Sequence, residues 1–65
     1  MNLGKKKTAR LKVLMNSLVV WRGVVSDVPE DAENRAARLL LAMNAYNDAA
    51  KEINEMFGEQ MVSLY

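Results

Sequence analysis

Residues 29–57 decide the fold, and their sequence is PEDAENRAARLLLAMNAYNDAAKEINEMF. Apolar side chains recur here with an alternating spacing of three and four residues, at Ala32, Ala36, Leu39, Met43, Tyr46, Ala50, Ile53 and Phe57. This heptad spacing, in a segment rich in Ala, Leu, Glu, Lys and Met, predicts one long helix. Pro29 suits the first turn of a helix and acidic residues follow it, so we expect the helix to begin there. Gly58 is where we expect it to end or bend, leaving residues 59–65 as a turn or a short third helix.

Residues 8–25 follow the same spacing, at Leu11, Leu14, Leu18, Trp21 and Val25. This pattern predicts a second, shorter helix, for which Thr8 is a plausible N-cap. A β-hairpin is the alternative, because valines favour strands and Asn16-Ser17 suits a turn. Strict alternation of apolar and polar residues is missing, so the helix is favoured.

The whole chain has 65 residues, of which 51% are apolar, and contains neither cysteine nor histidine. The composition excludes disulfides, thiolate or imidazole metal sites and catalytic triads. We therefore predict a protein that is not an enzyme and has no metal site and no cofactor. Because a single domain of this size is only marginally stable, self-association is the expected source of further stability.

The predicted fold class is all-α: an antiparallel helical hairpin, with a short first helix and a long second helix, that assembles as a homodimeric helical bundle. Residues 1–7 are expected to form a basic, flexible N-terminal arm, and residues 8–65 a single helical-hairpin domain. A helix over residues 29–57 would be roughly 43 Å long, against 25 to 30 Å for the first helix. Residues beyond about Ala45 would then lack a partner within the chain.

Apolar residues cluster on all sides of both helices at Leu18-Val19-Val20-Trp21 and Leu39-Leu40-Leu41-Ala42-Met43. A helix that is apolar all round is buried on more than one side, so these clusters predict contacts with other chains. The surface predicted for self-association and partner binding comprises Leu18, Val20, Trp21, Leu40, Leu41, Met43, Ile53, Met56, Phe57, Met61 and Leu64. The predicted function is therefore a small non-enzymatic binding or regulatory protein, a homodimer whose further partner is another protein.

Charge is divided along the chain. Residues 1–25 carry six basic residues and no acidic one, whereas residues 26–65 carry three basic and eight acidic residues. The basic cluster of Lys5, Lys6, Lys7, Arg10 and Lys12 supports an alternative function, RNA or DNA binding by the helical dimer. The arm could instead contact the acidic helix of a partner subunit. On that helix Asp48, Glu52, Glu55 and Glu59 share one outer face, which we interpret as solvated.

The basic start followed by apolar residues also suggests an export signal or a helix lying on a membrane surface. Asn16, Ser17 and Arg22 interrupt the apolar stretch, which is far shorter than a membrane span. We expect a soluble, cytoplasmic protein without an integral membrane segment.

Overall fold

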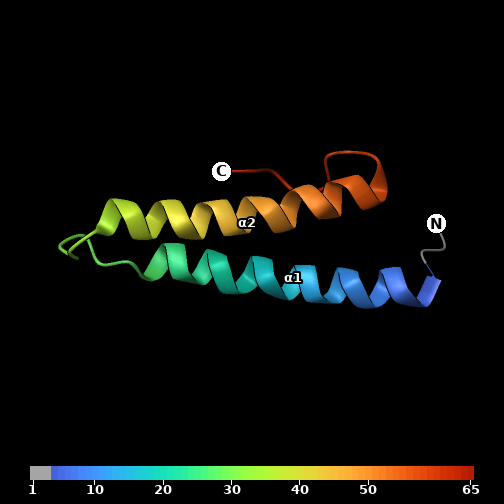
Figure 1. Ribbon diagram of the computed structural model, residues 1–65, viewed down its shortest axis with the longest axis horizontal. Helices are drawn as coiled ribbons and strands as arrows, with labels where there is room; N and C mark the ends of the chain where they lie inside the picture. The colour runs from blue at the N-terminus through green and yellow to red at the C-terminus, as the bar shows by residue number, and fades with distance from the viewer. Residues whose placement is uncertain (1–3) are drawn as a thin grey trace.

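Two helices packed side by side make up the fold. The computed structural model describes residues 4–65, in which α1 spans Gly4–Asp27 and α2 spans Arg35–Phe57. The helices run antiparallel and form a rod with principal extents of 46 × 19 × 12 Å (Figure 1). The predicted helical hairpin is confirmed, and the β-hairpin alternative is wrong because residues 4–65 contain no strand.

Helix α1 begins earlier than the sequence pattern predicts. Thr8 is an interior residue of α1, and its hydroxyl donates a hydrogen bond of 2.7 Å to the carbonyl oxygen of Gly4. A threonine hydroxyl can bond to the carbonyl four residues earlier without ending a helix, so the expected N-cap at Thr8 is wrong. The arm predicted over residues 1–7 falls partly on the first turn of α1 and partly on residues 1–3, which lie outside the described residues.

The start of α2 is also displaced from its predicted position. Residues 28–34 form the connection, in which the amide of Ala32 donates to the carbonyl of Pro29 and the amide of Arg35 to that of Ala32, both at 3.2 Å. Asn34 then adopts a left-handed conformation with φ 60°, which asparagine tolerates better than most residues. Since a right-handed helix cannot pass through that conformation, the prediction that it begins at Pro29 is wrong.

The two helices therefore have nearly equal lengths, 24 and 23 residues, or about 35 Å each. Leu11, Leu14 and Leu18 of α1 form one cluster with Ala49 and Ile53 of α2, so the prediction that residues beyond Ala45 lack a partner within the chain is wrong. Three of the five buried residues in 4–65 lie in that stretch. The buried residues of this range, between 0% and 7% exposed, are Leu14, Ala42, Ala49, Ala50 and Ile53.

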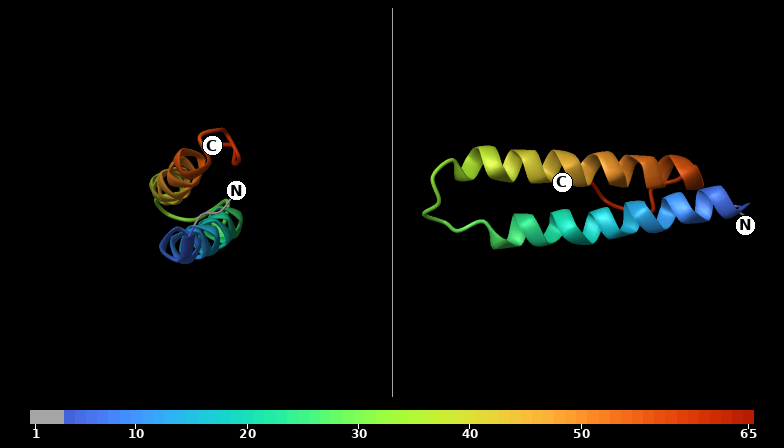
Figure 2. Two further views of the ribbon diagram at one scale, coloured as in Figure 1. Left: turned by 90° about the vertical axis from the view of Figure 1, so that its right-hand side faces the viewer. Right: turned by 60° about the horizontal axis from the view of Figure 1, so that its bottom comes forward.

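The chain turns sharply after α2 and returns along the helix. Gly58, with φ 68°, donates its amide hydrogen to the carbonyl of Glu55, and Glu59 donates to that of Asn54. This is the Schellman arrangement, in which a left-handed glycine ends a helix. Residues 59–65 are not helical, so the third-helix alternative is wrong, and they lie against one side of the hairpin (Figure 2).

Candidate interaction surface

The hairpin buries few large side chains and exposes many. Leu14 and Ile53 are the only large residues among the five buried ones, and the other three are alanines. Large apolar residues with 38% to 70% exposure are more numerous within residues 4–65: Val13, Met15, Val19, Val20, Val24, Leu40, Leu41, Met61, Leu64 and Tyr65. The apolar surface of the described chain therefore exceeds what its own core takes up.

The C-terminal segment covers one side of the hairpin, which we name the covered side. The side-chain oxygen of Asn54 accepts hydrogen bonds from the amides of Met61 and Val62, at 2.8 and 2.9 Å, and its NH₂ group donates to the Val62 carbonyl at 2.9 Å. The amide of Tyr65 donates to the Asn47 side-chain oxygen at 2.8 Å. Val62 packs against the core. A single asparagine side chain thus holds two consecutive residues of the returning segment against α2.

An aromatic contact holds the end of residues 59–65 against α2. The rings of Tyr46 and Tyr65 meet edge to face, with centroids 4.8 Å apart and an interplanar angle of 65°. Both tyrosines line one pocket with Arg22, and Arg22 and Tyr46 line a second pocket with Met15. The covered side therefore includes the flank of α1 that carries Met15 and Arg22, which are seven residues apart and share a helical face.

The other flank of α1 forms what we name the open side. Val13 and Met15 precede and follow the buried Leu14, and successive helical residues are rotated by about 100°, so they lie on opposite flanks of the buried stripe. Val20 and Val24 follow Val13 at seven and eleven residues and share its flank. We define the open side by Val13, Val20, Val24 and Leu41.

A pocket and an ion pair lie between α1 and α2 along the open side. Val24 and Leu41 line one pocket of about 320 Å³ near the connection. Toward the other end, the guanidinium of Arg10 donates to a Glu52 carboxylate oxygen at 2.8 Å, and both side chains remain about half exposed. The open side therefore has apolar residues near the connection and a charged pair near the start of α1.

The structure divides the predicted interaction residues into three groups. Val20, Leu40, Leu41, Met61 and Leu64 are exposed, and Trp21 and Met43 are half-buried. Ile53 is buried, with Leu18, Met56 and Phe57 packed around its cluster, so the chain itself already uses these four. The sequence reasoning missed Val13 and Val24, although their spacing from Val20 signals a second apolar stripe on the first helix.

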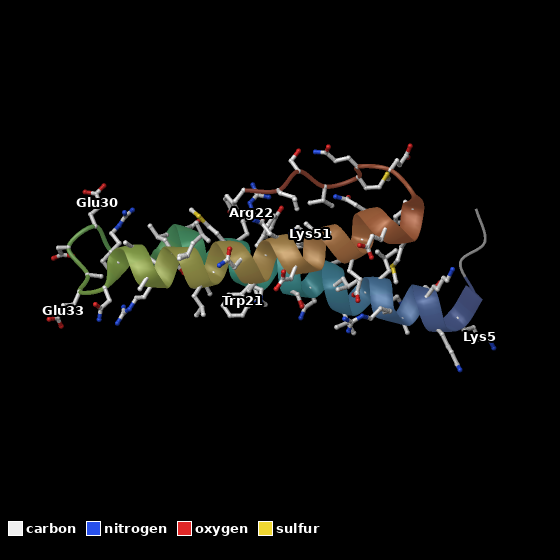
Figure 3. The ribbon with its side chains drawn as sticks, turned by 45° about the horizontal axis from the view of Figure 1, so that its top comes forward. Lys5, Trp21, Arg22, Glu30, Glu33 and Lys51 are labelled. Atoms are coloured by element: carbon white, nitrogen blue, oxygen red, sulfur yellow. The ribbon has the colours of Figure 1, made fainter. Side chains whose placement is uncertain are left out.

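The basic cluster lies on the first turns of α1, and all five of its members are exposed. Arg10 is the member that forms an ion pair within residues 4–65, and its partner Glu52 belongs to the predicted acidic face. One contact between the basic cluster and the acidic face therefore lies within a single chain. Figure 3 shows Lys5 at one end of the rod and the acidic residues Glu30 and Glu33 at the opposite end.

Residues 4–65 contain neither a metal-binding cluster nor a membrane-spanning helix. Within 4–65, no three Asp or Glu side chains lie close enough together to hold a metal ion. In that part of the chain, neither helix combines the length and apolar character needed to cross a bilayer. No protein-family model matches the sequence, and comparisons with curated proteins and with solved structures find no significant match.

Proposed function

We propose that this chain is a non-enzymatic binding protein that self-associates into a homodimeric four-helix bundle and then engages another protein. The observation that carries the proposal is the contrast between a core with two large side chains and ten large apolar residues left exposed among residues 4–65. Exposed apolar groups at this density mark interaction surfaces. The cytoplasmic location expected from the sequence belongs to the same proposal.

Energetics support self-association. Full burial of one Val, Leu or Ile side chain contributes about 1.5–3 kcal/mol, and Leu14 and Ile53 are the only large side chains buried within residues 4–65. Ordering each residue of a small domain costs about 1.5 kcal/mol of conformational entropy. Because this core offsets little of that cost, burial of further apolar surface would stabilise the hairpin. A second copy would bury the open side of both chains at once.

The two apolar regions suggest separate roles. Dimer formation through the open side leaves Met15, Val19 and Leu40 available, since they are outside the set that defines that side. We assign these residues to the further protein partner. Methionine is well suited to such a surface, because its flexible thioether adapts to partners of different shape.

Light scattering and thermal melting across a concentration series test self-association. We expect a dimer at micromolar concentration and a melting temperature that rises with protein concentration, because association stabilises the folded state by mass action. A stable monomer with a concentration-independent melting temperature would contradict the proposal. Pull-down with wild-type protein and with a Val19→Lys variant, followed by mass spectrometry, tests the second partner.

RNA or DNA binding is the second candidate function. It is favoured by the exposure of Lys5, Lys6, Lys7 and Lys12 on consecutive turns of α1. Replacing the first three by alanine should weaken binding to a labelled RNA or DNA and lower its salt dependence, since fewer counterions are released. Lys51→Ala, which removes an exposed lysine from α2, is the matched control. Equal binding by the triple variant and the control would remove this candidate.

A further inference from the structure

A second heptad stripe runs the length of α1 beside the stripe that faces the core. It steps by four and three residues through Lys6, Arg10, Val13, Ser17, Val20, Val24 and Asp27. Apart from the half-buried Ser17, every member is exposed. The stripe includes the three valines of the open side, so it is the part of α1 that a second chain would meet there.

From Arg10 to Asp27, the pattern of apolar and small residues in this stripe is nearly the same in both directions. When these six residues are reversed, Val13 exchanges with Val24, Ser17 exchanges with Val20, and Arg10 exchanges with Asp27. A twofold interface brings residue i against residue j and residue j against residue i, so a stripe of this kind can pair with its own reversed copy. In that register every apolar position meets a small or apolar one, and each end gains an opposite-charge pair.

The alternative twofold arrangement, with α1 parallel to its copy, pairs each residue with itself. Lys6 would face Lys6, Arg10 would face Arg10, and Asp27 would face Asp27. Like charges held together at an interface are unfavourable. Their repulsion in the parallel dimer therefore favours the antiparallel dimer. The ends of the rod add to this preference, because the acidic connection that includes Glu30 and Glu33 would lie beside its copy instead of beside the lysines.

We infer that the second copy of this chain docks on the open side with its α1 antiparallel to the first, in the register that places Val13 against Val24. This inference rests on the proposed self-association and adds its surface, orientation and register. The covered side offers no equivalent seam, since residues 59–65 already line it with Arg22 and Tyr46. Arg10, bonded to Glu52 in its own chain, gains Asp27 of the second copy as another acceptor.

Spin labels distinguish the arrangements, and the chain suits them because it has no native cysteine. A label on Lys5→Cys lies one residue outside the stripe. In the antiparallel dimer the two labels are about 40 Å apart along the seam, from about 13 residues on either side of its midpoint at 1.5 Å per residue. In a parallel dimer the two labels lie at the same position along the seam. Their separation is then set by the distance of about 10 Å between the helix axes, together with the length of the labels.

The measurement separates the two proposals. A pulsed dipolar distance near 40 Å supports the antiparallel seam. A short distance overturns the seam but keeps self-association, and the absence of any dipolar signal at micromolar concentration overturns both. In a second experiment, Val13→Cys and Val24→Cys proteins are oxidised alone and mixed. The antiparallel seam gives a cross-linked dimer only in the mixture, whereas cross-linking of each variant alone contradicts it.

Discussion

The two sides of the hairpin differ in what covers them. On the covered side, residues 59–65 supply hydrogen bonds to Asn54 and Asn47, an aromatic contact to Tyr46, and Val62 against the core. On the open side, exposed valines and Leu41 lie beside an ion pair between two half-exposed side chains. The chain thus completes one flank of its core with its own C-terminal segment and presents the other flank to solvent. The contrast teaches that the chain's own covering segment serves one side of the hairpin only, and four changes test it.

The largest effect is expected at the centre that both sides share. Ile53→Ala removes a side chain that is 3% exposed and leaves a cavity, so the free energy of unfolding should fall by about 2–5 kcal/mol in urea denaturation. Leu40→Ala, at an exposed position of the same helix, is the control and should change it far less. Similar losses in both variants would mean that the core does not lie where the buried cluster places it.

Asn54→Ala tests the covered side. The substitution leaves the amides of Met61 and Val62 and the Val62 carbonyl without their partner, at a cost of about 1–3 kcal/mol. Hydrogen exchange at these amides should accelerate while exchange within α1 changes little. Asn44→Ala, an exposed asparagine ten residues earlier, is the control. Unchanged exchange at residues 61 and 62 would contradict the role of Asn54.

Leu41→Glu tests the open side. Leu41 is 67% exposed, so the substitution should alter the single chain little but place a charge in the proposed dimer interface. We expect the dissociation constant of the dimer, measured by sedimentation equilibrium, to rise at least tenfold, which corresponds to about 1.4 kcal/mol. Leu40→Glu is matched in residue type and is 61% exposed. Equal effects of the two substitutions would show that the open side has no special part in association.

Glu52→Gln is expected to have the smallest effect. The Arg10–Glu52 pair is exposed on both partners, and such pairs contribute about 0.2–1 kcal/mol, less at high salt. Urea denaturation at low salt should show this loss, and denaturation at 1 M salt should show almost none. Glu55→Gln, an exposed carboxylate on the same helix, is the control. A salt-independent loss would indicate that Glu52 acts through packing.

The helices could be predicted because heptad spacing reports which face is buried. The stripe predicted on the first helix, Leu11, Leu14, Leu18, Trp21 and Val25, is buried or half-buried throughout. The start of α2 could not be predicted from Pro29, because one left-handed residue, Asn34, interrupts a pattern that otherwise favours a helix. The spacing of apolar residues does not report the backbone conformation of a single residue.

The candidate surface was only partly predictable. Exposure of Val20, Leu40 and Leu41 followed from the apolar clusters in the sequence, because two packed helices cannot bury every side of both. Burial of Ile53 did not follow, since it depends on the length of α1, which was underestimated. The hydrogen bonds of Asn54 to Met61 and Val62 join a side chain to backbone groups beyond the turn at Gly58. Hydrophobic spacing carries no information about such bonds.

Alanine at the centre of the hairpin determines which kind of mutation the fold tolerates. Ala42 and Ala50 are 0% exposed. Each position therefore has room for a methyl group but for no larger side chain. Larger side chains at these positions must displace the groups packed around them, and overpacking of this kind costs about 1–3 kcal/mol. At Ala42 and Ala50, unlike at Ile53, an increase in side-chain volume is therefore the more damaging change. Substitution by glycine or serine at these two sites should be better accepted than substitution by leucine.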